Sequence, residues 1–162
     1  MRIGKDGGDW IRLGLVGYQF PDAEDVRKRC SWHVVEGEAS CPDGAWDFRW
    51  QALACDESVR LIDWLRMAAD WLEAEAPVSG WVPAGTDFTE PNLSFSVNHD
   101  RGGGGLMIVM LNMEFRPPWR APSGTVDIPT VLHIPVNASE LRQAAGEWAA
   151  DVAKYPDDSG SR

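Results

Sequence analysis

The sequence has few cysteines, no long apolar run and no apolar leader, and each of these scarcities excludes a class of protein. The 3 cysteines, Cys30, Cys41 and Cys55, are an odd set, which argues against a framework of disulfides. No apolar run approaches the ~20 residues that a membrane-spanning helix needs. Met1 to Asp6 is not followed by the apolar segment of a secretory signal, so we expect a cytoplasmic protein that binds no membrane.

The short motifs of common active sites are also missing. Cys30, His33, Cys41 and Cys55 lack the paired short spacings of a zinc site, so we predict no bound metal. The run Gly102 to Gly105 lacks the Lys-Ser/Thr that follows a phosphate-binding loop. No serine or cysteine lies in a nucleophile motif, and we therefore predict no catalytic residue, no cofactor and no enzyme activity.

Positive charge is scarce relative to negative charge. The chain has 15 Lys and Arg residues against 25 Asp and Glu residues, which gives a net charge of −10 and a pI near 4.6. Such a chain repels phosphate backbones and anionic membranes, and it favours encounter with a basic partner. We therefore expect a protein partner and no direct contact with nucleic acid.

The overall composition is that of an ordinary globular domain. The chain has 162 residues, of which 44% are hydrophobic and 25% are charged, so it can bury a core without disulfides or metals. No internal repeat or linker divides it. We expect one domain over residues 1–156 and a disordered tail over residues 157–162.

The clearest predicted element is a β-hairpin. Asn92 to Asn98 alternates polar and apolar residues, as a strand with one buried face does. The buried face should carry Leu93, Phe95 and Val97. A glycine-rich loop from His99 to Gly105 follows, and we expect its run Gly102 to Gly105 to be mobile. Leu106 to Phe115 is then apolar on both faces and suits a central strand.

Three further strands are predicted before the first helix, and they should form a meander. They are Trp10 to Phe20, Ser31 to Ser40 and the segment that follows the turn Cys41 to Gly44. In the third strand Trp46, Phe48 and Trp50 share one face, and we expect all three in the core.

Two helices and a last strand complete the predicted fold. Asp56 is expected to cap a helix that runs to about Ala74, with a core stripe at helical spacing. Thr125 to Val136 should be a strand, and its two prolines favour an edge position or a bulge. Asn137 and Glu140 predict a capping box at the start of the last helix. The expected fold class is α+β, an antiparallel sheet of about six strands with two helices packed mainly on one face.

Three phrases of the sequence, together with the order of the elements, resemble the WapI family of bacterial immunity proteins. The phrases are Gly17-Tyr18-Gln19-Phe20-Pro21, Phe88-Thr89-Glu90-Pro91-Asn92-Leu93-Ser94-Phe95 and Glu114-Phe115-Arg116-Pro117-Pro118-Trp119. The resemblance implies a cytosolic protein that neutralises the toxic C-terminal domain of a secreted polymorphic toxin, often a nuclease. The phrases look structural, so they do not locate a binding surface.

Eight residues are candidates for toxin binding. They are Asp22, Glu24 and Asp25 after the first strand, Asp63, Asp70 and Glu73 on the outer face of the first helix, and the loop residues Trp81 and Trp119. A domain built to hold nucleic acid presents Arg and Lys that acids can pair with, and loop aromatics can anchor a partner. A small-molecule-binding protein or an enzyme on the same antiparallel fold is the alternative.

Overall fold

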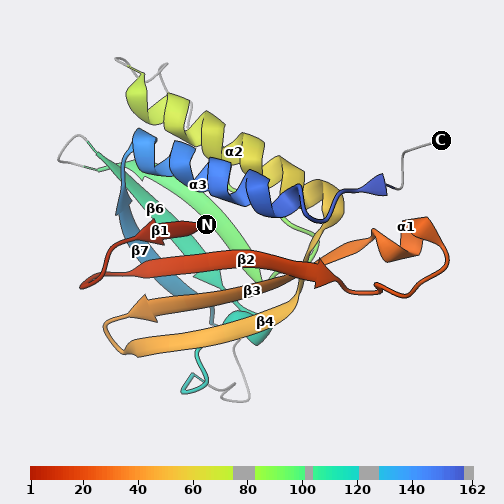
Figure 1. Ribbon diagram of the computed structural model, residues 1–162. Coiled ribbons are helices and arrows are strands. Elements are labelled where there is room, and N and C mark those ends of the chain that lie inside the picture. The colour runs from red at the N-terminus through yellow and green to blue at the C-terminus, as the bar shows by residue number, and fades with distance from the viewer. Residues whose placement is uncertain (75–82, 101–103, 121–127, 159–162) are drawn as a thin grey trace.

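The computed structural model describes residues 1–74, 83–100, 104–120 and 128–158, which form two antiparallel sheets and two main helices (Figure 1). Helices α2 (Cys55–Glu73) and α3 (Ala138–Val152) lie side by side across the top of the molecule in that view. The predicted α+β class, antiparallel pairing and two main helices are confirmed. The prediction of a single sheet of about six strands is wrong, because seven strands divide into a four-stranded and a three-stranded sheet.

The four-stranded sheet is a meander in chain order. Its strands are β1 (Arg2–Gly4), β2 (Trp10–Tyr18), β3 (Trp32–Cys41) and β4 (Gly44–Ala54). The three longer strands lie where the sequence predicts them. β1 was not predicted, because three residues are too few to display an alternating pattern.

The edge position of β4 changes the environment of one predicted core residue. Trp46 and Phe48 are buried as predicted, and Phe48 lies so close over Gly37 that a Cβ there would meet its ring at 2.4 Å. Trp50 shares their face, since it pairs with the buried Val35, yet 41% of Trp50 is exposed. The prediction that Trp50 belongs to the core is therefore wrong. β4 is the last strand of its sheet, so no described strand covers the far side of the ring.

The three-stranded sheet contains the predicted hairpin. Its strands are β5 (Leu93–His99), β6 (Gly105–Leu111) and β7 (Thr130–Val136), with β6 in the centre as predicted. β7 lies at the edge, as Pro135 within it indicated. Residues 125–127, where the sequence places the start of this strand, are outside the described residues.

The hairpin differs from the prediction at both ends of β6. His99 pairs with Gly105, so both ends of the predicted loop are strand residues. Gly102 and Gly103, on which the predicted mobility mainly rests, are outside the described residues. At its other end β6 stops before Phe115, because the Asn112 side chain accepts a hydrogen bond from Met113 N and starts the 3-10 turn η1 (Met113–Phe115).

Both main helices begin with a carboxylate that binds the backbone before the first turn. In α3 the predicted capping box is present, with Glu140 N donating to Asn137 Oδ1 and Asn137 N donating to Glu140 Oε2, both at 3.0 Å. In α2 the backbone N of Ala54 donates to Glu57 Oε2 at 2.9 Å. Glu57 therefore closes the first turn of α2, and the prediction that Asp56 caps this helix is wrong.

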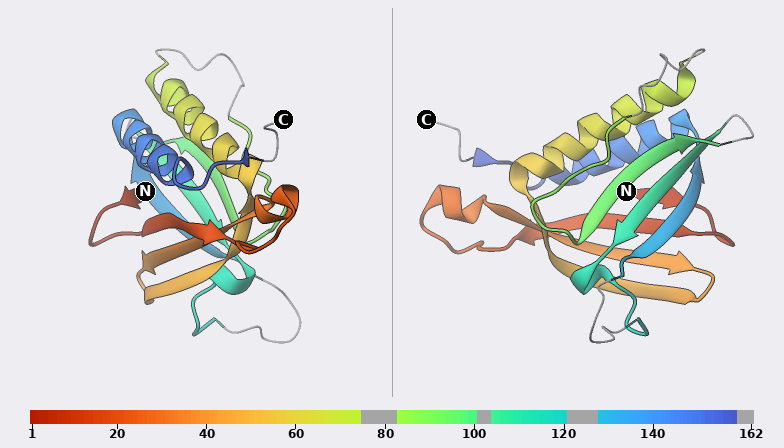
Figure 2. Two further views of the ribbon diagram at one scale, coloured as in Figure 1. Left: turned by 45° about the vertical axis from the view of Figure 1, so that its right-hand side comes forward. Right: turned by 180° about the vertical axis from the view of Figure 1, so that it is seen from behind.

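One hydrophobic core joins the inner faces of both sheets to the helix pair, and Figure 2 shows the sheets as two layers below the helices. The predicted stripe of α2 is buried at Leu61, Leu65 and Ala68, and Leu72 packs at its margin. Trp148 of α3 is the largest fully buried side chain. The core therefore positions both helices by their apolar faces and leaves their charged faces to solvent.

Two further segments complete the description. The short helix α1 (Val26–Arg29), which was not predicted, lies on an arm that projects from the end of β2 (Figures 1 and 2). Residues 159–162 of the predicted tail are outside the described residues. Across the described part of the chain, no helix has the apolar length required to cross a bilayer.

Candidate partner-binding surfaces

The first predicted acidic cluster lies on the projecting arm. Asp25 caps α1 by accepting a hydrogen bond from Arg27 N at 2.9 Å. Asp22 and Glu24 are exposed, and neither bonds to another described residue. Three basic residues follow at once, Arg27, Lys28 and Arg29. The arm is therefore a surface of mixed charge and is less acidic than its first half suggests.

The second predicted cluster lies on the outer face of α2 and is held by an arginine of α3. Arg142 Nη2 donates to Asp70 at 2.8 Å, and Arg142 Nη1 donates to Glu73 at 2.7 Å. The hydrogen bond from Arg142 lowers the pKa of Glu73. Asp63 lies 3.7 Å from Arg66 of its own helix. A basic partner would therefore compete with arginines already in place, and no sequence signal marks Arg142 because its role depends on helix packing.

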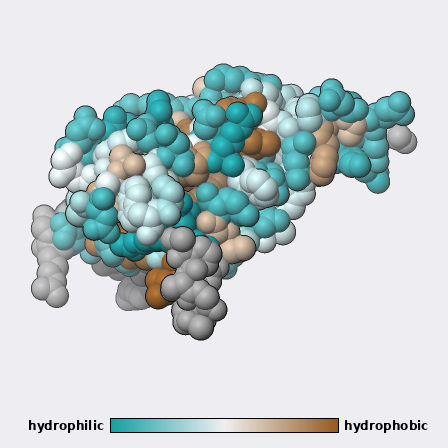
Figure 3. All heavy atoms as spheres, turned by 90° about the horizontal axis from the view of Figure 1, so that it is seen from below, coloured by the Kyte–Doolittle hydropathy of each residue, from teal (hydrophilic) through white to brown (hydrophobic). Residues whose placement is uncertain are grey.

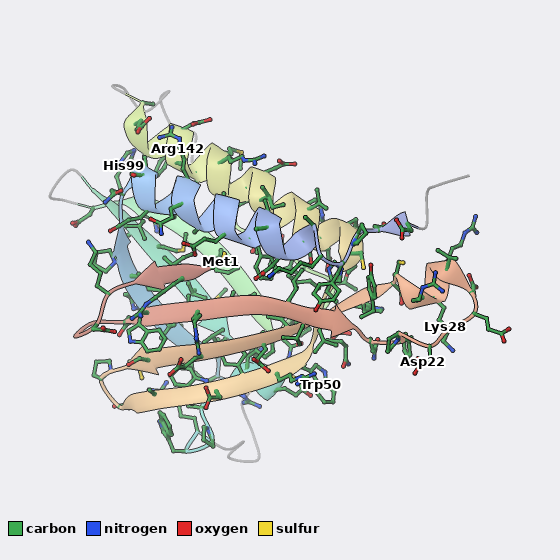
Figure 4. The ribbon with its side chains drawn as sticks, viewed as in Figure 1. Met1, Asp22, Lys28, Trp50, His99 and Arg142 are labelled. Atoms are coloured by element: carbon green, nitrogen blue, oxygen red, sulfur yellow. The ribbon has the colours of Figure 1, made fainter. Side chains whose placement is uncertain are left out.

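The two acidic clusters lie far from each other. Figure 4 shows Asp22 on the arm at one end of the molecule and Arg142, with the acids it holds, at the opposite end of the helix pair. One small patch of a partner cannot contact both. Each cluster is therefore a separate candidate surface.

Of the two predicted loop tryptophans, the structure describes only Trp119. Trp119 is 46% exposed, and its ring meets the buried ring of Trp46 edge-on with centroids 5.7 Å apart. Trp81 is outside the described residues. Trp50 of β4, which was not among the candidates, is a further exposed indole beside Trp119 in the described chain. Sequence reasoning missed it because its spacing is that of an inward-facing residue.

The phrase from Phe88 to Phe95 forms a buried polar connection to α2. Glu57 is only 2% exposed and accepts hydrogen bonds from Thr89 N at 2.7 Å and from Thr89 Oγ1 at 2.8 Å. It also accepts from Ala54 N and from Arg60 Nη2. A buried carboxylate is stable when donors surround it in this way. The phrase therefore serves the fold by fixing the segment before β5 to the start of α2.

The phrase from Glu114 to Trp119 is also structural. The buried Asn92 donates from Nδ2 to Glu114 Oε2 at 2.7 Å, which links the two phrases directly. Phe115 is fully buried, and its carbonyl oxygen accepts a hydrogen bond from Trp46 Nε1 at 2.9 Å. These contacts tie η1 to both sheets.

The arrangement closest to a catalytic pair is buried in the core. His33 Nε2 lies 3.0 Å from the carbonyl oxygen of Tyr155, which can only accept, so Nε2 carries the proton. His33 Nδ1 then accepts from the Ser58 hydroxyl at 2.8 Å. Burial lowers the pKa of His33. Because both side chains have no exposed surface, a substrate cannot reach them, and the pair serves to hold the segment after α3.

The histidines and cysteines do not assemble into a metal site in the described part of the chain. No group of three or more His, Cys, Asp or Glu residues there could hold an ion. Cys30 and Cys55 are buried, and burial raises the pKa of the Cys55 thiol to about 12. A thiol with so high a pKa is a poor nucleophile at neutral pH.

One cleft lies on the outer face of the four-stranded sheet and has a volume of about 730 Å³. Charged side chains of both signs line it, and most are satisfied within the protein, as in the pair of Arg12 with Glu38 at 2.8 Å. Asp47, also in its lining, has no ion-pair partner among the described residues. The cleft therefore presents charged side chains along neighbouring strands, and no single lining residue stands out as a catalytic group.

Comparison with known proteins gives one match that covers nearly all these elements. A family model described as the immunity protein WapI-like family matches residues 2–156. No match was found among curated proteins. The structure of the plant transcriptional regulator PBF-2 matches with a TM-score of 0.46 at 11% identity, over 96% of this chain and 80% of that chain. WHY1 from Arabidopsis thaliana has the same TM-score and identity, over 96% of this chain and 83% of that chain.

Proposed function

Because the chain belongs to the immunity protein WapI-like family, we propose that it binds the C-terminal toxin domain of a secreted polymorphic toxin and blocks its activity. The observation that carries the proposal is the family match over residues 2–156, which includes every helix and strand described above. The protein acts in the cytoplasm, by occupying the toxin and not by catalysis.

The proposed partner is a basic nuclease domain. A net charge of −10 attracts a domain whose own surface is built to hold phosphate. An acidic inhibitor can also exclude the nucleic acid by lying on the same basic surface. The charge supports fast association, while the contacts that fix the complex must come from particular side chains.

We place the first contact of the toxin on the arm, at Asp22, Glu24 and Asp25. Asp22 and Glu24 make no bond with any described residue, so a toxin arginine would meet no internal competitor for them. Trp119 and Trp81 remain the aromatic candidates for toxin binding, separate from the acids of the arm. On α2, Asp63, Asp70 and Glu73 form the second candidate surface, where internal arginines reduce the attraction.

If a polymorphic toxin is encoded beside this gene, binding to its C-terminal domain tests the function and the surface together. Isothermal titration calorimetry would compare the wild type with a D22K/E24K variant and a D70K/E73K variant, at low and at high salt. We expect the arm variant to lose more affinity, because its acids have no other partner. The matched control is K28E with R29E, which reverses charge on the same arm. No binding by the folded wild type would overturn the proposed function, whereas equal affinities for all variants would overturn only the surface.

The cleft on the four-stranded sheet is the observation that favours the alternative, a small-molecule-binding protein. Its volume of about 730 Å³ is sufficient for a small ligand. A ligand there should raise the melting temperature of the purified protein by mass action. A toxin gene next to this one would favour immunity, and a metabolic operon would favour the alternative.

A further inference from the structure

Three of the four outer edges of the sheets are covered by other parts of the chain. The cover is a side chain that accepts from a strand N–H, and the bonds are Phe95 N to Thr86 Oγ1 (2.8 Å), His133 N to Asp9 Oδ2 (2.8 Å) and Arg2 N to Glu147 Oε2 (3.1 Å). These bonds occupy one outward N–H each on β5, β7 and β1 respectively. Edge strands without such cover are templates for pairing with another chain.

The fourth edge, β4, has no such cover in the described chain. β4 is the longest strand, with 11 residues, and it pairs with β3 on one side. On its other side, no described residue makes a hydrogen bond to the backbone of residues 45–53. An open edge of this length can accept a strand from a partner.

The charges on β4 indicate which strand it can accept. Asp47 and Arg49 point to the outer face, while Phe48, between them in the sequence, points inward. Arg49 is 3.6 Å from Glu36. Asp47 faces Glu38 on β3, a like charge, and has no described cation on its open side. The missing cation should therefore come from the strand that adds to this edge.

We propose that a second copy of this chain pairs antiparallel with β4, around a two-fold axis at Phe48. In this register Asp47 of each copy lies opposite Arg49 of the other, so two opposite-charge pairs form at once. A shift of the axis by one residue places Asp47 opposite itself or Arg49 opposite itself, and like charges directly opposite are destabilising. Charge therefore selects one register, and the contact is the self-complementary kind that a two-fold dimer needs.

The exposed tryptophans fit the same register. With the axis at Phe48, Trp50 of one copy lies opposite Trp46 of the other, on the inner face of the joined sheet. Trp119 packs edge-on against Trp46 and beside Gly44, so Trp50 of the second copy would meet it there. Trp50 and Trp119, the two indoles that the described part of each monomer exposes at 41% and 46%, would be covered together.

Backbone pairing and these few anchors must supply most of the contact. Seen from below, the side on which β4 forms the sheet edge in Figure 1, the surface is mainly hydrophilic with small separate hydrophobic spots (Figure 3). A broad apolar interface is therefore not the basis of this association. The dimer should be moderate in affinity and depend on the pairing of Asp47 with Arg49.

A charge swap tests the register by sedimentation velocity over a range of protein concentration. The wild type should sediment as a concentration-dependent dimer. D47R and R49D should each raise the dimer dissociation constant about tenfold or more, because each converts two attractive pairs into two repulsive pairs. The double variant D47R/R49D restores opposite charges across the axis and should recover dimerisation. The matched control, R66D, makes the same charge change as R49D on the exposed face of α2, and it should leave the dimer unchanged.

Two outcomes would overturn the proposal. One is a wild type that stays monomeric at every concentration, and the other is a dimer that D47R and R49D leave intact although both variants are folded by circular dichroism. If the wild type is monomeric and D47R lowers toxin affinity, the edge accepts a toxin strand and the second copy is excluded. W50A is an independent test of the dimer because it leaves the charges in place. It should raise the dimer dissociation constant at least tenfold.

Discussion

The two ends of helix α2 hold carboxylates in opposite ways. Near the N-terminus Glu57 is buried, and it accepts from the backbone, from Thr89 and from Arg60. Near the C-terminus Glu73 is exposed on the surface and bonds to Arg142 of the neighbouring helix. The buried acid connects three segments of the fold, whereas the exposed acid joins two helices that the core already holds together.

This difference separates the residues that define the fold from those that can meet a partner. A buried carboxylate that loses its donors is costly, and donors that lose their carboxylate are costly too, so such a group tolerates little change. An exposed ion pair is screened by water and salt and contributes little. The phrase from Phe88 to Phe95 lies at the buried end, where Thr89 bonds to Glu57, which explains why this phrase identifies the family without marking its binding surface.

The largest effect should come from removing the buried acid. E57A leaves the N–H groups of Ala54 and Thr89 and the Thr89 hydroxyl without their acceptor, and we expect a loss of about 3 kcal/mol in the free energy of unfolding. Urea denaturation at pH 7.5 would measure it. E73A at the exposed end is the control, and an equal loss in both variants would contradict the comparison.

A smaller loss should follow from removing one donor at the buried end. T89V keeps the shape of the side chain and the backbone N–H, and removes the hydroxyl that donates to Glu57 at 2.8 Å. We expect a loss of about 1 to 1.5 kcal/mol by denaturation in urea. In the background of E57A the same substitution should cost much less, because the bond is already absent. Additive losses would show that Thr89 acts apart from Glu57.

The two ends should also respond to acid in different pH ranges. The pKa of native His33, which bonds to Ser58 at the buried end, is below its ordinary value of 6.5, so the unfolded chain binds that proton more readily. Stability should therefore fall as pH drops below 6.5, by up to about 1.4 kcal/mol per pH unit. The pKa of Glu73 is lowered below 4.5, so the stabilisation from its ion pair persists above that pH and is lost only as pH falls through the native pKa.

Unfolding free energies at half-unit steps from pH 8 to pH 4 would check this separation. The variant H99Q/H133Q removes the two surface histidines and should keep the wild-type slope between pH 6.5 and pH 5. A flat profile in that range for the folded wild type would show that His33 does not stay neutral in the native state.

The smallest effect on stability should come from the exposed end itself. R142Q removes the cation that holds Asp70 and Glu73, and we expect a slight destabilisation at low salt that disappears at high salt. Thermal unfolding at two ionic strengths would measure it. If the α2 surface binds the toxin, the same variant should raise toxin affinity, because it exposes both acids without an internal competitor.

The elements with strong local patterns could be predicted from the sequence. The alternation in β5, the stripe of α2 and the Asn137–Glu140 capping box are all confirmed. Each of these signals depends on residues close together along the chain, and their spacing alone fixes which face is buried. The family resemblance could be recognised for a related reason, since its phrases are continuous segments.

The features that were missed depend on what lies across space. The exposure of Trp50 follows from the order of the strands, which the spacing of Trp46, Phe48 and Trp50 does not contain. The division into two sheets and the pairing of Arg142 with the α2 acids likewise depend on long-range packing. For the candidate site, acidity could be predicted from composition, but the hydrogen bonds from Arg142 to Asp70 and Glu73 could not, because they depend on how the two helices pack.

The edge-on contact of Trp46 with Trp119 also gives the protein an optical signature. With their centroids 5.7 Å apart, the two indoles are close enough for their transition dipoles to couple, and we expect that coupling to contribute a band to the far-ultraviolet circular dichroism. Trp46 belongs to the sheet and Trp119 to the segment after η1, so the band reports whether that segment is seated. The native chain thus carries a label-free probe at the end of β4, ready to follow any molecule that approaches that edge.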